Sequence, residues 1–586
     1  MHMPRRFRAF VWILLGLLLI PVGGWAQRMS TPLVYTDQGS SWTGSVRTDF
    51  YCIDQGSQLM QLGWLRALER PDGTPFLKND LSEYAYLSGD VCGTGLPLGF
   101  TTSRSEGKEW VGMTCAACHT RDITNGGRTY RIDGGPALVD FQALLVDLDD
   151  AVATTLSDPA SFGRFAAKVL RAPTPAQAAR LRTHLQYWHG RFHALMNRAL
   201  PKAVPWGLGR LDAVGMIFNR LTGLDIDGGR VVEDNLREAN APARYPFLWN
   251  APYQTLTQWP GFAQNGNDGF ALVRNVGEVL GVFGHFQPKW IGWMYWLDNS
   301  VDVKGLKALE TLIKKIGPPM WPWTTDPALV REGEVVFSTP TGSDPSCLEC
   351  HGARASPPDA ATAGREGRQR LMTTLYDVKS DPTEYANLGR MSYSKVLNGA
   401  TLIFPAIKSC DSAFNILRFS VVGTILQNSL LSGRALTSAE AQKLTTAFLY
   451  PGSKVRIKES RRGSVARSAR RSGVFPTPPT CDDEPNTSPA RYEARVLEGV
   501  WAAAPYLHNG SIATLQELLT APAERAASFV VGPAYDSKKV GLSEVQPVGS
   551  LTRVAADPGN SNQGHNFGTG LGPRQKEALI EFLKKL

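Results

Sequence analysis

Two short motifs of cysteine and histidine have the types and spacing to do chemistry. Residues 115–119 read Cys-Ala-Ala-Cys-His and residues 347–351 read Cys-Leu-Glu-Cys-His. Two thiols three positions apart on a helical turn can form thioether bonds to both vinyl groups of a haem, and the adjacent imidazole then reaches the iron. The pattern predicts two covalently attached haem c groups, each held by one set of residues: Cys115, Cys118 and His119, and Cys347, Cys350 and His351.

Two other kinds of site share the C-x-x-C spacing. A dithiol redox site requires a βαβ context, and neither motif follows a clear buried strand in the sequence. A zinc site requires further Cys or His ligands at short spacing, and the nearest other cysteines are distant. With 8 Cys and 9 His in 586 residues, one chance C-x-x-C-H match is expected only about 0.002 times. Haem attachment is therefore the favoured interpretation.

Four cysteines remain outside the motifs. Cys52 and Cys92 lie in the N-terminal region, and Cys410 and Cys481 flank a basic stretch. The economical pairing is two local disulfides, Cys52 with Cys92 and Cys410 with Cys481. Four cysteines allow three connectivities, so the two crossed pairings stay open.

A haem iron has a second axial position, whose occupant decides between electron transfer and oxygen chemistry. His184, His189 and His193 lie in a stretch with the pattern of an ordinary amphipathic helix, which we interpret as structural. His508 lies in a turn with rigid flanks, and His565 ends a Gly/Asn-rich segment whose backbone can approach a large flat cofactor. His508 and His565 are therefore the candidate second ligands.

Composition and the N-terminus indicate an exported globular protein. The chain is 43% hydrophobic and 20% charged, which excludes a mainly disordered state. Three arginines precede an apolar run at residues 10–20, and Gly24-Trp25-Ala26 follows, so residues 1–26 are expected to be a signal peptide, with an uncleaved anchor helix as the alternative. No later apolar run reaches the roughly 18 to 20 residues of a spanning helix. We expect a periplasmic or secreted protein with no membrane span after cleavage.

The net charge of +9 is concentrated in two segments. Residues 454–471 carry eight basic residues and one acid, and residues 1–26 carry three arginines, which leaves the rest of the chain at −1. The basic stretch is rich in Ser, Gly and Arg and has no apolar period, so we expect a flexible loop over residues 452–475. A docking site for an acidic partner is the alternative, and a nucleic-acid-binding surface is not expected.

The remaining pattern predicts a mainly α fold with long loops and a few short β-strands. Short runs at 27–100 suggest loops and small strands, and helical periodicity appears at 140–152, 174–198, 301–316, 438–449 and 573–586. Prolines at 318, 319 and 322, followed by Thr324-Thr325-Asp326-Pro327, mark a seam near residue 325. The expected domains are an N-terminal region at 27–100 and two haem domains at 101–325 and 326–586.

Several segments together resemble a known family. They are the two haem motifs, residues 132–137, residues 247–250 with Gln258-Trp259, residues 501–511, and residues 559–565 with Phe567-Gly568. This set is similar to the di-haem rubber oxygenases, which belong to the di-haem cytochrome c peroxidase superfamily. The resemblance implies two c-type cytochrome domains, with a reactive first haem on His119 and a second haem held between His351 and His565. His508 would then lie against the haem edge or the propionates.

The resemblance also bears on the reaction. Di-haem peroxidases place a displaceable histidine shortly after the first motif, and residues 120–183 contain none. The first haem is therefore expected to have an open or apolar distal side. The candidate lining residues are Phe247, Trp249, Trp259 and Phe262, and Trp249 or Trp259 is also a candidate bridge between the haems. For each of these residues, packing in the core is the alternative. We expect activation of dioxygen for attack on an apolar, alkene-like small molecule or polymer, while the second haem stores or passes an electron.

Two alternative functions stay open at this point. One is a di-haem cytochrome c peroxidase that reduces hydrogen peroxide, and the other is a non-catalytic di-haem electron carrier. Either would bring in an electron-transfer protein as a further partner. Related peroxidases hold a calcium ion between their domains, which leaves calcium open as an additional cofactor.

Overall fold

The computed structural model describes residues 31–291, 294–342, 344–352, 354–355, 371–401, 405–433, 436–447, 481–483, 489–547, 550–553 and 559–586. It is 41% helical and 17% strand. The predicted signal peptide and the basic loop at 452–475 lie outside the described residues. Of the helices within the described ranges, none combines the length and the apolar character that crossing a bilayer requires.

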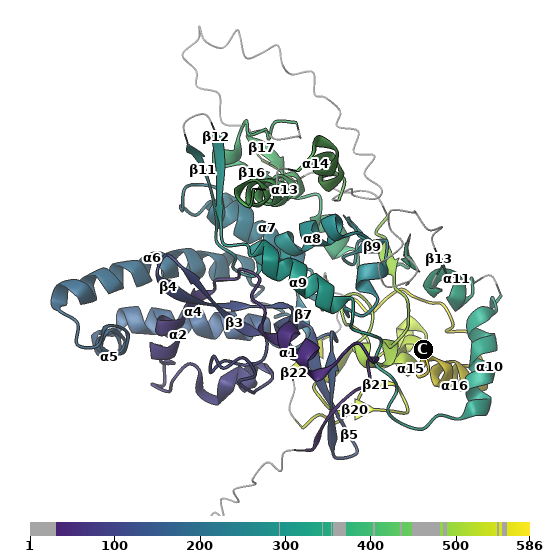
Figure 1. Ribbon diagram of the computed structural model, residues 1–586. Helices are drawn as coiled ribbons and strands as arrows, with labels where there is room; N and C mark the ends of the chain where they lie inside the picture. Colours follow the sequence, from purple (N-terminus) through teal and green to yellow (C-terminus); the bar gives the residue numbers. More distant parts are fainter. Residues whose placement is uncertain are drawn as a thin grey trace, which may run out of the picture.

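A long helical hairpin follows the first haem motif. It consists of α4 (Phe141–Ser157), α5 (Pro159–Leu170) and α6 (Pro175–Ala199), and Figure 1 shows α4 and α6 side by side with α5 at their far end. α6 begins at a capping box between Thr174 and Gln177, and the side chain of Asp140 caps α4. These caps fix where both helices begin.

Two three-stranded sheets hold the N-terminal region. The first has the order β2 (Met60–Gln61), β4 (Lys108–Met113), β3 (Phe100–Ser105). The second has the order β1 (Leu33–Tyr35), β6 (Arg128–Asp133), β5 (Thr120–Asn125), in which β1 is parallel to β6. Two short helices, α1 (Gly44–Cys52) and α2 (Leu62–Ala67), complete this region. The predicted loops and small strands therefore alternate with short helices.

A second helical group is centred on α13. Its members are α7 (Ala213–Phe218), the π-helical turn η2 (Asn219–Asp225), α8 (Asp268–Gly281), α9 (Val303–Ile313), α13 (Ala413–Leu431) and α14 (Ser438–Thr445). The hairpin β11 (Phe286–Ile291) and β12 (Met294–Asn299) packs beside α13 (Figure 1). α7, α8 and α13 share one apolar cluster.

The C-terminal part contains the second haem motif. Its helices are α10 (Pro327–Ser338), α11 (Cys347–His351), α12 (Thr383–Asn387), α15 (Leu515–Leu518) and α16 (Pro573–Leu583). The side chain of Asp326 caps α10, as the seam near residue 325 predicts. α10 crosses α16 closely at Gly333, where a Cβ atom would lie 2.0 Å from the carbonyl oxygen of Ala578.

The other strands form two-stranded pairs. They are β7 (Arg210–Leu211) with β8 (Ala243–Arg244), β9 (Leu256–Thr257) with β10 (Ala263–Gln264), β13 (Arg354–Ala355) with β14 (Leu371–Met372), β15 (Thr374–Tyr376) with β18 (Tyr492–Ala494), β16 (Met391–Tyr393) with β17 (Cys410–Ser412), β19 (Ser528–Val531) with β22 (Ser550–Arg553), and β20 (Tyr535–Asp536) with β21 (Gly541–Leu542).

The apolar clusters cross the predicted domain boundary near residue 325. One cluster joins side chains that are hundreds of residues apart, among them Trp42, Ile132, Trp249, Trp501 and Leu579. The cause is the return of the C-terminal segment onto the first part of the chain: Thr124 donates to the carbonyl of Pro533, and Asn125 donates to that of Tyr535. The two expected haem domains therefore share a core.

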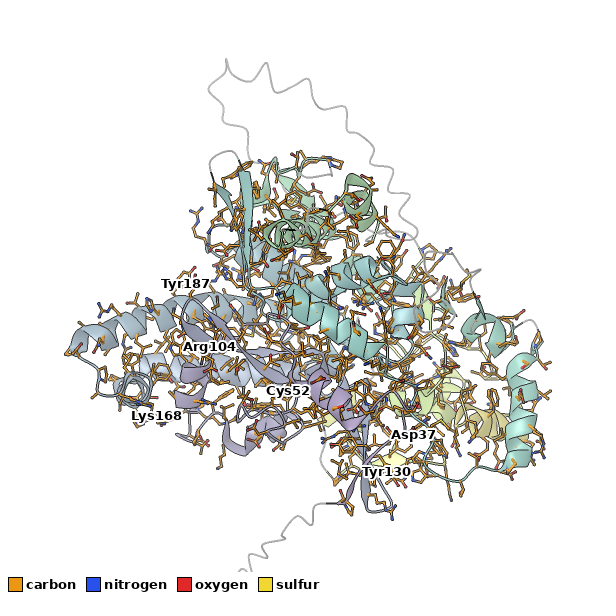
Figure 2. All side chains as sticks on the ribbon, in the orientation of Figure 1. Asp37, Cys52, Arg104, Tyr130, Lys168 and Tyr187 are labelled. Carbon is orange, nitrogen blue, oxygen red and sulfur yellow. A yellow bond between two sulfur atoms is a disulfide. The ribbon has the colours of Figure 1, made fainter. Side chains whose placement is uncertain are left out.

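The expected disulfides are confirmed, since Cys52 is bonded to Cys92 and Cys410 to Cys481. Figure 2 shows Cys52 near the middle of the molecule, on α1. All five helices expected from periodicity are present as α4, α6, α9, α14 and α16, each ending within a few residues of its expected bounds. Among the longer helices, the expected periodic segments did not include α5, α8, α10 and α13. In α13, side chains buried on most sides weaken the amphipathic pattern.

Candidate functional site

The first haem motif is one helical turn between the two N-terminal sheets. α3 (Cys115–Cys118) follows β4 and precedes β5, and the amide of His119 donates to the carbonyl of Cys115. Gly99 lets the chain pass against this turn, because a Cβ at Gly99 would lie 2.2 Å from the nitrogen of Ala117. The sequence analysis did not predict the strand β4 before the motif. However, β4 and β5 belong to separate sheets, so α3 does not connect two strands of one sheet. There is no βαβ unit of the dithiol redox kind here.

The second haem motif is the short helix α11. Ser346 and Glu349 form a capping box at its start, in which the Glu349 carboxylate accepts the Ser346 amide at 2.7 Å. None of the four motif cysteines is in a disulfide. Within the described ranges, neither motif joins a group of three ligand atoms close enough to share a metal ion. The thiols are therefore suited to haem attachment and not to zinc.

The two motif histidines are supported in the same way. Nδ1 of His119 donates to the carbonyl of Pro246 at 2.8 Å, and Nδ1 of His351 donates to the carbonyl of Arg495 at 2.8 Å. Burial lowers the pKa of His119 to about 4 and also lowers the pKa of His351. Both imidazoles are neutral at pH 7, and the Nδ1 hydrogen bond leaves Nε2 to bind a metal.

His565 lies opposite His351. Their ring centroids are 6.2 Å apart with an angle of 41° between the planes. Two imidazoles that bind one metal ion through nitrogens at about 2.0 Å hold their ring centres roughly 6.3 Å apart. Burial, and then the neighbouring His351, lower the pKa of His565 to about 4. This pair of neutral rings fits the two axial ligands of one haem iron.

The loop that carries His565 is held by a buried arginine. The Arg525 guanidinium donates to the carbonyls of Asn562, Gly564 and His565, and the last two distances are 2.8 and 3.1 Å. Gly564 has φ +82°, and a Cβ there would lie 2.4 Å from the carbonyl carbon of Lys379. Arg525 and Gly564 together fix the position of the His565 backbone.

His508, the competing candidate, occupies a different environment. Its ring stacks on Tyr492 at 3.9 Å with an angle of 16°. Its carbonyl accepts from the amide of Arg244, and burial lowers its pKa to about 4. The histidine ring packed opposite His351 is therefore that of His565.

Arg495 connects the supports of the two motif histidines. Its carbonyl accepts from His351, and its guanidinium donates to the carbonyl of Phe247 at 2.9 Å. Phe247 directly follows Pro246, whose carbonyl accepts from His119. A continuous series of covalent and hydrogen bonds thus runs from one motif imidazole to the other.

Three of the four aromatic candidates surround this connection. Phe247 stacks on Trp249 at 4.6 Å, and the Arg495 guanidinium lies 4.3 Å from the centre of the Phe247 ring and 5.6 Å from that of Trp259. Phe247 and Trp259 both lie against Arg495, and Phe247 directly follows Pro246, whose carbonyl accepts from His119. Their positions suit the bridging role better than the lining of an open haem face. Phe262 is the one of the four that borders the cavity described next.

A small cavity, with about 20 Å³ of space for water-sized molecules, lies close to the first motif. Gln258, Arg274 and Glu278 contribute polar groups to it, and the amide of Gln258 donates to the Glu278 carboxylate at 2.6 Å. Burial raises the pKa of Glu278. Burial, and then the charge of Glu278, raise the pKa of the Cys118 thiol to about 12, so this carboxylate lies near the attachment site. The apolar wall consists of Val214, Ile217, Phe218, Phe262, Ala263, Phe414 and Leu417.

Three buried guanidinium groups lie near one another between the motifs. They belong to Arg121, Arg244 and Arg495, and each has at least one nitrogen that lacks a hydrogen-bond partner among the described residues. Burial, and then the charge of Arg495, lower the pKa of Arg244 to about 9. Buried positive charge is costly, and Glu493 offsets only part of it at Arg495. The propionate carboxylates of a haem would supply further negative charge, so these residues fit the cofactor.

Comparison with known proteins bears on the same part of the chain. The family model described as RoxA-like, cytochrome c-like matches residues 491–530. The chain thus carries a RoxA-like cytochrome c segment, which supports a RoxA-like family and a haem-containing redox protein with haem c as cofactor. The matched segment includes Arg495, His508 and Arg525, so it contributes to the surroundings of both motif histidines.

Two curated proteins of Sinorhizobium fredii (strain NBRC 101917 / NGR234) are also similar. The Uncharacterized protein y4iJ is 29% identical, and the alignment covers 93% of this chain and 92% of that protein. The Uncharacterized protein y4iM is 26% identical over 50% of this chain and 48% of that protein. The first alignment spans nearly the full length of both proteins.

Sequence reasoning missed the polar residues that support the site. Arg495 and Arg525 look like ordinary surface charges in the sequence, but both are buried. Glu278 and Gln258 are 20 residues apart and meet only through the packing of α8. A buried arginine has no local sequence signal, because its burial depends on backbone carbonyls contributed by distant segments.

Proposed function

We propose that the protein is an exported di-haem c-type oxidoreductase, similar to the rubber oxygenases of the di-haem cytochrome c peroxidase superfamily. The observation that carries the proposal is the difference between the two motif histidines. His351 has a second imidazole opposite it, whereas the ring contact found for His119 in the described part of the chain is with Tyr245. The first motif also has the cavity nearby.

The first site would be the reactive one. A haem held by Cys115, Cys118 and His119 supplies dioxygen activation when it is bound. The chain itself supplies a mainly apolar wall that includes Phe218, Phe262 and Leu417. Such a wall would disfavour water and suit an apolar, alkene-like group. The hydrogen bond from His119 to Pro246 fixes the orientation of the imidazole.

The second site would store or pass an electron. His351 and His565 would hold the iron of the second haem between two imidazoles, which would exclude a further ligand unless one imidazole leaves. The bonds through Arg495, together with the stacked Phe247 and Trp249, give a compact route between the two histidine supports. An electron-transfer protein would then be the external partner.

One observation favours a peroxidase as the second candidate. Reduction of hydrogen peroxide requires a group that moves protons near the reacting oxygen atoms. Glu278 lies in the cavity, its pKa is raised by burial, and Gln258 orients its carboxylate. This pair would accept a proton from peroxide and return it to the leaving oxygen.

The test is the absorption spectrum of the purified, reduced protein with and without carbon monoxide. The proposal expects one carbon monoxide per chain, bound at the first haem. Subsequent addition of polyisoprene under dioxygen, or of hydrogen peroxide with a reduced electron donor, separates the two enzyme candidates by product. Binding at neither haem would refute both and leave the electron carrier.

A further inference from the structure

The hairpin of α4 and α6 brings together three metal-ligating side chains outside the two haem motifs. Asp149 comes from α4, and His189 and His193 come from α6. One ligand atom from each residue lies within 4.8 Å of the others, and this is the one such group within the described ranges. The i, i+4 spacing places both imidazoles on one face of α6, toward α4.

The distances place the Asp149 carboxylate between the two rings. Oδ1 lies 3.0 Å from Nε2 of His189, and Oδ2 lies 2.7 Å from Nδ1 of His193. The two ring centroids are 5.4 Å apart. Ligand atoms around a tetrahedral zinc ion at about 2.0 to 2.2 Å are separated by roughly 3.3 Å. The three side chains are therefore already near the spacing of a shared ion.

Two of these atoms are buried without a hydrogen-bond partner. Oδ1 of Asp149 and Nε2 of His189 have none among the described residues, although they are 3.0 Å apart, because their orientation does not direct an N–H at the oxygen. A purely structural Asp–His pair would satisfy both atoms with that hydrogen bond. Oδ2 of Asp149 accepts a hydrogen bond from Nδ1 of His193 at 2.7 Å, whereas Oδ1 of Asp149 and Nε2 of His189 converge without a bond between them. A cation would satisfy these two atoms.

Asp149 is buried, whereas the two histidines are more exposed to solvent. Asp149 is 8% exposed, and the side chains of His189 and His193 are 16% and 54% exposed. A carboxylate in this position would anchor an ion inside the hairpin, and the exposed His193 would leave one coordination position open to solvent. Two imidazoles and a carboxylate suit borderline divalent ions such as zinc, and not calcium or magnesium, which prefer oxygen ligands.

We propose that Asp149, His189 and His193 form a binding site for one divalent transition-metal ion of the zinc type, which joins α4 to α6. The ion would hold together the two long helices of the hairpin in Figure 1. This proposal does not depend on the reaction at the haems.

The test uses the full-length haem-loaded protein without a purification tag. The protein is treated with EDTA, given one equivalent of Zn²⁺ and desalted, and zinc and iron per chain are then measured by mass spectrometry. Covalent haem resists EDTA, so iron serves as the internal measure of folded protein. We expect one zinc per chain in the natural protein and at least a tenfold loss in Asp149→Asn and His189→Ala.

Matched controls lie on the same two helices. His184 on α6 and Asp150 on α4 are exposed and outside the group, so His184→Ala and Asp150→Asn should retain one zinc. If Asp149→Asn loses haem iron through misfolding, the half-exposed His193→Ala variant gives the same test without disturbing the core. The proposal would be overturned if the natural protein held no more zinc than His189→Ala. It would also be overturned if the control variants lost as much zinc as the site variants.

Discussion

Arg525 should decide whether His565 stays in place as the second ligand of the second haem. The substitution Arg525→Met keeps the length and apolar stem of the side chain and removes the guanidinium. In the structure this group donates to the carbonyls of Asn562, Gly564 and His565, and Arg525 is 7% exposed. Water cannot easily replace these bonds, so the loop that places His565 loses its main support.

The size of the effect follows from the number of lost bonds. A net contribution of about 1 kcal/mol for each of three hydrogen bonds weakens the placed loop by about 3 kcal/mol. This corresponds to a shift on the order of 100-fold toward the displaced loop. The control is Arg574→Met, because Arg574 is exposed and pairs with Glu332 on the surface, where an ion pair contributes about 0 to 1 kcal/mol.

The assay is carbon monoxide titration of the reduced protein. We expect one carbon monoxide per chain in the natural protein and in Arg574→Met, and binding at a second haem in Arg525→Met. Added imidazole should suppress the second binding event by replacing His565. An Arg525→Met variant with the stoichiometry and visible spectrum of the control would refute the reasoning that Arg525 holds His565 in place.

Three further predictions concern the cavity, the disulfide and pH. Glu278→Gln should lower peroxide turnover by about 100-fold if this carboxylate moves the proton, while carbon monoxide binding stays unchanged; equal turnover in a stopped-flow assay would exclude that role. Replacing Cys52 and Cys92, which close a loop with a sequence separation of 40, with serine should lower the free energy of unfolding by about 4 kcal/mol, measured by denaturant titration; an unchanged midpoint would contradict it. The pKa values of His119 and His565 are lowered to about 4 from 6.5, so the unfolded chain binds more protons below pH 6.5 and stability should fall between pH 6.5 and 4; thermal unfolding that is flat over this range would show that these rings are not buried and neutral.

The sequence was sufficient for features that depend on local pattern. Helical periodicity from residue 174 predicted where α6 begins, and the seam at Thr324-Thr325-Asp326-Pro327 predicted that Asp326 or a neighbouring Thr caps the segment that follows. The separation of Cys52 from Cys92 favoured the pairing that the structure contains. Each of these features requires only residues that are near one another in the chain or limited in their pairing.

The features that the sequence did not reveal depend on distant segments. Arg495 joins the Pro246-Phe247 backbone to His351 only after residues 489–547 fold back across the first part of the chain. The same return explains why a boundary at residue 325 does not separate two cores. His189 and His193 fit an ordinary amphipathic helix in the sequence, and only the packing of α4 against α6 brings Asp149 to them.

The most direct measurement of the central claim is the intact mass of the exported protein under denaturing conditions. Two covalent haems, on residues 115–119 and 347–351, predict a mass above that of the polypeptide by two haem groups. Replacing Cys115 and Cys118 with alanine should remove one group, and replacing Cys347 and Cys350 should remove the other. A mass equal to that of the polypeptide alone would contradict the account.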